Sequence, residues 1–425
     1  MVQHAWRSGF YSLLTFRPVR CSATSKIPIR IMEAVKMPNL LLLPVPSEPP
    51  SRRSLARAYA TVFAAVLERL KDPARSSSLM IAAVGPFLGT ESSEHHAWSH
   101  LQSILAGIYS LISYICAQES IATDINAGPG AVDTRVILVD ENTKIAGIAG
   151  HSIVWSLPDF AMVGAPWNLV FYPEIDNGRE LLEAFLSAAS NQAATYGELI
   201  GLDIGDSHLV AQTQAGDGKT CGSHGIVCLG GTFDHLHPGH KLLLSAAALL
   251  LRIPPKSQPP CRFIIGVTGD ELLKNKKFAE YLQPWQVRAA GVIDFLESVI
   301  DGPGNRGHQG CFTETSPGSM TRLFRAGAVL VECVEIQDAF GPTITREDMD
   351  ALVVSGETRS GGQAVNERRA DMGWRALEIY EVDVLDAKEL SDSNYAETGD
   401  FAAKISSTAI REHRAVAAAG TTSRS

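Results

Sequence analysis

The stretch that decides the fold reads GIVCLGGTFDHLHPGH and spans residues 225–240. Its apolar beginning predicts a β-strand. Gly230 and Gly231 end that strand, and glycines there let the backbone turn sharply and come close to a ligand. A helix is expected to begin just before the second of two histidines, His237 and His240, so that both lie beside a helix N-terminus. Free N–H groups and the helix dipole favour anions there, which predicts a phosphate site.

Strands and helices alternate through the rest of the second half. Strands are expected at 262–267, 329–336, 351–354 and 377–385, with a helix at 284–300. Residues 302–319 are rich in Gly, Ser, Thr and Pro and are expected to form a flexible loop. The alternation predicts an α/β fold with a Rossmann-like, doubly wound parallel sheet, whose ligands bind at the carboxyl ends of the strands.

The first half predicts a second α/β domain. Strands are expected at 39–45, 79–84 and 136–139, with helices at 54–71, 97–118 and 178–190. We find no catalytic motif there. The adjacent His95 and His96 would point to different faces of a helix, which argues against a metal-binding pair. The expected organisation is a basic tail at 1–37, a domain of unknown role at 38–205, a linker at 206–223, the motif-bearing domain at 224–416 and a disordered tail at 417–425.

Charge and composition exclude several classes of protein. The formal net charge is -9, and an acidic chain offers no broad basic surface for nucleic acid. The seven cysteines form no C-x-x-C pair, which argues against a zinc ribbon or a disulfide framework and favours a reducing, cytoplasmic compartment. Residues 97–118 lack charged side chains, but their apolar residues follow three-four spacing, so we predict a buried amphipathic helix and no membrane span.

The N-terminal tail leaves localisation open. Residues 1–32 carry five basic residues and no acidic ones, a pattern typical of a mitochondrial presequence. A plain disordered tail, or a start at Met32 or Met37, explains it equally well. We therefore expect a cytoplasmic protein, with mitochondrial import as the alternative.

Three further segments have residues suited to binding phosphate. KISSTAIR at 404–411 places three hydroxyls at a helix start and an arginine one turn later. LLKNKK at 272–277 follows a strand with three lysines in four positions. VVSGETRSGGQAVNERR at 353–369 is a strand, a small-residue turn and a basic helix, in which at least one of Arg368 and Arg369 is expected to be plain surface charge. Residues 216–220 imitate a P-loop, but Thr213 stands where its first glycine belongs, and we reject it.

Together these motifs resemble the HxGH nucleotidylyltransferase superfamily and, more narrowly, the eukaryotic, fungal-type pantetheine-phosphate adenylyltransferase family. The resemblance covers about 224–415. It implies transfer of the adenylyl group of ATP to 4'-phosphopantetheine, with Mg2+, giving 3'-dephospho-CoA and pyrophosphate in coenzyme A biosynthesis. The first half weakly resembles the region that precedes this domain in the animal bifunctional CoA synthase. With no valid P-loop and little sequence after Arg411, we expect a monofunctional enzyme.

The resemblance also implies residue roles. His240 would hydrogen-bond the α-phosphate, and His237 would hold the ATP phosphates beside it. Thr232 would bind the phosphate of 4'-phosphopantetheine, with Phe233 next to it. One lysine would bridge the reacting phosphates, with Lys276 the first choice and Lys274 the second. The other ATP contacts would come from Gly230, Gly231, Gly356, Thr358, Arg359, Ser406, Ser407, Thr408 and Arg411, the last pairing with the leaving pyrophosphate. No protein-held metal site is implied.

Several alternatives stay open. A cytidylyltransferase, or an adenylyltransferase acting on a nicotinamide or flavin nucleotide, shares the first motif, although the 355–366 loop argues against these. A class I tRNA synthetase shares the histidine turn, but an acidic chain does not suit it. A non-catalytic nucleotide-binding scaffold is the alternative from a different class. The domain at 38–205 is the candidate for binding protein partners, and the oligomeric state is not predicted.

Overall fold

The computed structural model describes residues 37–46, 50–87, 98–124, 127–141, 152–163, 166–189, 196–203, 224–302, 313–385, 390 and 406–422. The expected tail at 1–36, the histidines at 95–96 and the linker at 206–223, with its P-loop imitation, lie outside these residues.

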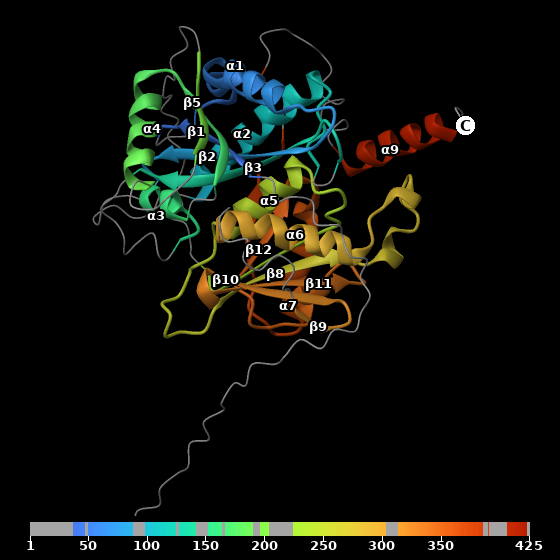
Figure 1. The fold of residues 1–425 in the computed structure, drawn as a ribbon. Helices are drawn as coiled ribbons and strands as arrows, with labels where there is room; N and C mark the ends of the chain where they lie inside the picture. Colours follow the sequence, from blue (N-terminus) through green and yellow to red (C-terminus); the bar gives the residue numbers. More distant parts are fainter. Residues whose placement is uncertain are drawn as a thin grey trace, which may run out of the picture. The chain divides into compact units, whose positions relative to one another are not determined.

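The first half of the chain forms a six-stranded parallel sheet with flanking helices (Figure 1). The strand order is β4-β3-β2-β1-β5-β6. Its elements are β1 (Asn39–Pro44), α1 (Arg52–Leu70), β2 (Ser77–Gly85), α2 (Trp98–Gln118), β3 (Val132–Asp140), β4 (Trp155–Ser156), α3 (Leu157–Met162), β5 (Trp167–Pro173), α4 (Asp176–Ala189) and β6 (Tyr196–Leu202). The central strands are buried on both faces, which explains their continuous apolar runs.

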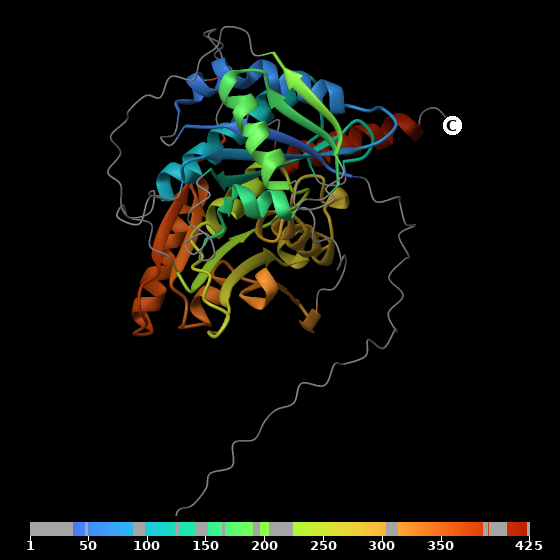
Figure 2. The same cartoon turned by 60° about the vertical axis from the view of Figure 1, so that its left-hand side comes forward.

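The second half forms a seven-stranded sheet of order β13-β12-β7-β8-β11-β10-β9, part of which is visible in Figure 2. The first five of these strands are parallel, whereas β10 and β9 are antiparallel additions at one edge. The elements are β7 (Ile226–Gly231), α5 (Pro238–Ala248), β8 (Cys261–Thr268), α6 (Trp285–Ile300), β9 (Thr313–Ser316), β10 (Ser319–Phe324), β11 (Val329–Ile336), β12 (Ala351–Ser355), α7 (Arg359–Asp371), β13 (Glu378–Val382) and α9 (Ser407–Thr422). The predicted α/β class with a doubly wound sheet and a second α/β layer is confirmed.

Two local expectations are wrong. Residues 313–319 were expected within a loop, but they form β9, a turn and the start of β10, with the turn glycine Gly318 at φ 76°. The Pro-Gly pair at 317–318 therefore marks a hairpin turn, not a long loop. The expected disordered tail at 417–425 is helical up to Thr422, because the alanines at 415 and 417–419 extend α9. Strands β4, β5, β6 and β10 and helix α3 also have no counterpart in the expected elements.

The two sheets share one hydrophobic core. Tyr109 and Ile108 of α2 belong to the same buried cluster as Leu244 of α5 and Val299 of α6. The indole N–H of Trp98 donates to the carbonyl of Ala246 at 2.7 Å. The two halves of the chain therefore stabilise each other by continuous packing.

Helix α2 is the one described helix that is long and apolar enough to cross a membrane by length and composition. Its most apolar window has a mean hydropathy of 1.3, and 78% of that window is buried inside the protein. Its apolar side chains pack on α1, α5 and β3. This burial favours the interpretation of α2 as a core helix.

Candidate active site

The site lies where the order of the parallel strands reverses. From β7 the chain proceeds to β8 on one side, and it later returns to β12 on the other side of β7. The switch point is therefore between β7 and β12, and open α/β sheets bind ligands at the carboxyl ends of strands at such a point. Gly231 ends β7 and Ser355 ends β12, so two of the predicted motifs meet there.

The loop after β7 is held in an unusual backbone conformation. Phe233 and His235 have φ of 51° and 47°, in the left-handed region that non-glycine residues rarely occupy. Gln283 holds the loop with two hydrogen bonds, since its backbone N–H donates to Asp234 Oδ1 at 3.0 Å and its side-chain oxygen accepts from the His235 N–H at 2.8 Å. Strain kept in place by specific contacts is typical of functional loops.

The two histidines of the motif stack on each other. His237 is the N-cap of α5, and its ring lies 3.9 Å from the ring of His240, with 27° between the planes. The ring of Phe233 packs against His240 at 5.3 Å. The Nδ1 atoms of both histidines are buried and have no hydrogen-bond partner among the described residues. Buried polar atoms are normally satisfied, so these two are available to a ligand or to water.

Two glycines make this packing fit. A Cβ on Gly231 would stand 2.9 Å from Cζ of Phe233, and one on Gly239 would stand 3.2 Å from Cε1 of His237. A Cβ on Gly230, by contrast, would meet nothing closer than 3.8 Å. Gly231 and Gly239 therefore allow the rings to lie close to the backbone, whereas a Cβ on Gly230 would make only ordinary van der Waals contacts.

Both imidazoles are neutral at neutral pH. Burial lowers the pKa of His240 to about 4, although the nearby Asp234 acts in the opposite direction. Burial also lowers the pKa of His237 well below its ordinary value, and the neighbouring His240, Lys241 and His235 add to that effect. A neutral imidazole offers one N–H donor and one acceptor, so each ring can donate one hydrogen bond to a phosphate oxygen.

The serine-threonine motif meets the histidine loop through α9. The hydroxyl of Ser407 donates to the carbonyl of Asp234 at 2.8 Å, and that of Ser406 accepts from the backbone N–H of Ala409 at 3.3 Å. Arg411 is 3% exposed and donates to Asp234 Oδ2 at 2.6 Å, to the carbonyl of Lys277 at 3.0 Å and to the hydroxyl of Thr408 at 3.2 Å. Its guanidinium therefore fastens α9 to the loop, and the expected phosphate contact stays a prediction.

The remaining predicted residues are placed differently from one another. Lys274 and Lys276 are exposed on the turns that follow β8, and Lys274 pairs with Glu271 at 2.5 Å. Lys276 has no ion-pair partner among the described residues, which leaves it free for a ligand.

Thr232 is partly buried, whereas Phe233 is 1% exposed, so Phe233 supports the ring of His240 and does not face open space.

The loop after β12 is exposed. Gly356, Thr358 and Arg359 face solvent at the start of α7, and Arg359 pairs with Glu381 of β13. Arg368 is exposed, as expected for one of the two arginines. Arg369 is neither surface charge nor exposed to a ligand, because it is fully buried and donates to the carbonyls of four residues, Thr343, Arg346, Glu347 and Arg375.

Sequence reasoning missed Arg288, which holds the ends of two strands. Arg288 of α6 is fully buried and donates to the carbonyl of Thr232 at 2.6 Å, to that of Thr268 at 2.7 Å and to Asp270 Oδ1 at 2.7 Å. The loops after β7 and β8 are therefore fixed to each other beside the histidines. The available signal was a lone arginine inside an apolar helix, which is rarely buried unless it has partners.

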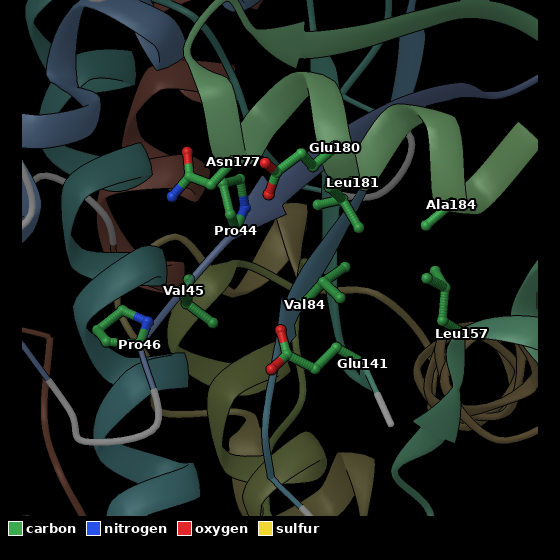
Figure 3. Close-up of a pocket in the computed structure, with 10 residues that line it drawn as sticks. All are labelled: Pro44, Val45, Pro46, Val84, Glu141, Leu157, Asn177, Glu180, Leu181 and Ala184. Atoms are coloured by element: carbon green, nitrogen blue, oxygen red, sulfur yellow. The ribbon is translucent and has the colours of Figure 1, made fainter. Parts of the chain in front are cut away.

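A separate cavity of about 390 Å³ lies at the carboxyl ends of the first sheet (Figure 3). Figure 3 shows Leu181 of α4 facing Val84 and Glu141 from the ends of β2 and β3. The described residues that line this cavity include two glutamates and no Lys, Arg or His. That lining does not suit a polyphosphate, and the histidine loop is the better candidate site.

Within the described residues, no group of three or more His, Cys, Asp or Glu side chains could hold a metal ion. Mg2+ is commonly bound by one or two carboxylates together with substrate phosphates and water. Mg2+ bound through ATP therefore stays a prediction for this site.

Comparison with known proteins relates part of this chain to a named family. A protein named phosphopantetheine adenylyltransferase from Pyrococcus abyssi is 32% identical over 185 residues, which are 44% of this chain and 87% of that protein. The chain belongs to the phosphopantetheine adenylyltransferase family. A family member from Saccharomyces cerevisiae is 34% identical over 186 residues, 44% of this chain and 47% of its own length. The match thus spans about half of that yeast relative.

Three further matches are described without a role. Residues 32–206 match a family described as "Domain of unknown function (DUF8446)". An uncharacterized protein of Schizosaccharomyces pombe is 33% identical over 264 residues, 61% of this chain and 69% of that protein. A solved structure, titled as a protein with unknown function from Archaeoglobus fulgidus, is 27% identical and covers 37% of this chain, but its TM-score of 0.25 carries no structural argument.

Proposed function

We propose that this protein is a pantetheine-phosphate adenylyltransferase of the eukaryotic, fungal type. It transfers the adenylyl group of ATP to 4'-phosphopantetheine and releases pyrophosphate, forming 3'-dephospho-CoA in coenzyme A biosynthesis. One observation supports this most strongly: in a chain of this family, two stacked histidines with unpartnered Nδ1 atoms lie at the N-terminus of α5, at the switch point of the sheet.

The nucleophile in this reaction is the phosphate of 4'-phosphopantetheine, which is already anionic at neutral pH. One of its oxygens forms a bond to the α-phosphorus of ATP, and the bond between that phosphorus and the α,β-bridging oxygen breaks. The electron pair leaves with pyrophosphate. Because the nucleophile carries no proton to remove, the protein needs neither a covalent nucleophile nor a general base. Catalysis consists of alignment and charge neutralisation.

We assign the residues on that basis. His240 donates a hydrogen bond to the α-phosphate, and His237 holds the neighbouring ATP phosphates. Thr232 contacts the phosphate of the acceptor, and Lys276, exposed and unpaired among the described side chains, swings toward the reacting phosphates. Ser406, Ser407 and Thr408, whose helix is tied to the histidine loop, lie next to the β- and γ-phosphates. When bound to ATP, Mg2+ would offset the charge of the ATP phosphates.

The test is a pyrophosphate-release assay with MgATP and 4'-phosphopantetheine, with detection of dephospho-CoA by mass. Wild type is expected to form the product. His240→Gln is expected to lower kcat on the order of 100-fold, as loss of one transition-state donor does. His413→Gln, which changes an exposed histidine on α9, is the matched control and should be unaffected.

Two results would overturn the proposal. One is a folded wild-type protein that forms no dephospho-CoA. The other is activity that survives His240→Gln unchanged. Parallel reactions with CTP, and with nicotinamide and flavin mononucleotides as acceptors, separate the proposed reaction from those of other nucleotidylyltransferases.

A further inference from the structure

Lys241 directly follows the second histidine of the motif, yet it is buried within the protein. Its side chain is 0% exposed. The ammonium donates to Asp133 Oδ1 at 2.5 Å, to the carbonyl of Thr134 at 3.0 Å and to the carbonyl of Thr123 at 3.1 Å. Three donors meet three acceptors, so the charge is fully satisfied. All three acceptors belong to the N-terminal half of the chain.

The ion pair is part of a larger network that links the two halves. Asp133 also pairs with Arg135 at 2.9 Å, and Arg135 reaches Asp294 of α6 at 2.8 Å. Burial alone would raise the pKa of Asp133, but Arg135 and Lys241 lower it overall, so the carboxylate is charged. Cation and carboxylate thus alternate from α5 through β3 to α6.

A second carboxylate reaches the site from the same side. Asp124, which is 4% exposed, accepts from the guanidinium of Arg414 on α9 at 2.9 Å. Its other near neighbour is His235, whose Nδ1 lies 3.8 Å from Asp124 Oδ2. The N-terminal half therefore contacts the histidine loop, α5 and α9 through charged groups.

These contacts fix the orientation of α5. The backbone N–H of Lys241 donates to the carbonyl of His237 at 3.1 Å, so the two residues lie one above the other on the first helical turn. A rotation of that turn would tear the ammonium of Lys241 away from its acceptors and leave a buried charge unpaired, which is costly. The direction of the Lys241 side chain therefore determines where the rings of His237 and His240 point.

We propose that the N-terminal domain is a positioning element of the active site, in which Asp133 holds Lys241 and thereby places His237 and His240 against the phosphates. Lys241 and Asp133 are positioning residues, because neither has to touch substrate. This assigns a role to the region that matches a domain of unknown function. The inference rests on the proposed adenylyl transfer for its activity readout only.

The test uses the full chain, because the shared core makes separation of the halves uninformative. The pair is replaced by apolar residues of similar volume, Lys241→Met with Asp133→Leu. Such replacement of a buried pair usually preserves stability but removes its directional hydrogen bonds. Arg135 loses Asp133 in this variant but keeps its second carboxylate, Asp294. We expect a folded protein whose kcat falls at least about tenfold while the KM for ATP changes little, since misplacement affects the transition state more than ground-state binding.

A matched control replaces a comparable pair away from the histidines, Arg322→Met with Glu297→Leu, which should leave kcat unchanged. Asp133→Glu is the second variant. It keeps the charge and moves it by one methylene, so folding is retained, and kcat should fall several-fold. Wild-type kcat in both Asp133 variants would overturn the proposal.

A readout without turnover separates this proposal from the proposed function. The ring signals of His237 and His240 in NMR spectra should shift in both Asp133 variants and not in the control pair, with or without MgATP. Unchanged histidine signals would overturn the positioning role even in an active enzyme. If wild type makes no dephospho-CoA but the histidine signals still shift in the Asp133 variants, the positioning role is supported while the adenylyl-transfer proposal fails.

Discussion

Arg411 and Asp234 form a buried ion pair, with 2.6 Å between Nη1 and Oδ2, although they are 177 residues apart in the sequence. Asp234 stands between the strained residues of the histidine loop, and Arg411 stands in the first turns of the last helix. The pair therefore closes the site by joining the end of the domain to its beginning. It also explains why the guanidinium is buried, where the sequence pattern indicated an arginine that faces phosphate.

Arg411→Met is expected to destabilise the protein by about 3–5 kcal/mol, because Asp234 keeps a buried charge without its cation. Urea unfolding measures the change. Arg368→Met, at an exposed position on α7, should change stability by less than about 0.5 kcal/mol and is the control. A loss below about 1 kcal/mol for Arg411→Met would show that the ion pair does not hold α9 in solution.

Arg288→Met should lower both stability and turnover. The substitution leaves the carbonyls of Thr232 and Thr268 without their buried donor, and each unsatisfied group costs about 1–3 kcal/mol. Thermal unfolding and kcat/KM are the measurements. Arg375→Met offers the contrast, since its pair with Asp350 is 69% exposed on the arginine side and exposed pairs contribute about 0–1 kcal/mol. Equal effects of the two substitutions would contradict the conclusion that Arg288 holds the loops after β7 and β8 together.

Gly231→Ala should reduce activity more than stability. The new Cβ would meet the ring of Phe233 at 2.9 Å, and that ring supports His240. A displacement near 1 Å of a catalytic group costs on the order of 100-fold in rate, so a drop of about 10- to 100-fold in kcat is expected. Steady-state kinetics beside a thermal melt give the answer, and an active Gly231→Ala enzyme would mean that Phe233 does not position the ring.

Gly291→Ala is the opposite case. Gly291 lies inside α6, and a Cβ there would meet nothing within 4 Å. Alanine should therefore stabilise the protein by about 0.5–1 kcal/mol through helix propensity, with activity unchanged. Chemical denaturation measures the gain. A destabilised variant would indicate packing on that face of α6 that the described residues do not account for.

His240 should make stability depend on pH. Its pKa is about 4 in the folded protein, below the ordinary value near 6.5 that applies when the chain is unfolded. Between these values the unfolded chain binds a proton that the folded chain does not, so stability is present above pH 6.5 and falls as the pH drops toward 4. Melting temperatures should therefore show that the stability of wild type relative to His240→Gln falls as the pH drops through this window. A His240 ring that titrates near 6.5 by NMR would contradict the buried, neutral state.

Much of the fold could be predicted from local patterns. Continuous apolar runs located β1, β2, β7, β8, β11 and β12, because strands buried on both faces have no polar alternation. The edge strands β9 and β10 were missed, since their Pro-Gly turn has the composition of a loop. The expectation for the tail failed because alanine-rich ends favour helix even at a terminus.

The candidate site divides in the same way. The sequence by itself determined where the histidine turn, the lysine turn and the hydroxyl motif stand, because glycine turns, strand ends and helix caps are set by neighbouring residues. Only the tertiary structure decided which charges are available. The sequence alone does not show that Lys241, Arg288, Arg369 and Arg411 are all buried against specific partners. Burial depends on groups far away in the chain, such as Asp133 for Lys241 and Asp234 for Arg411, and only folding brings those groups within hydrogen-bond distance.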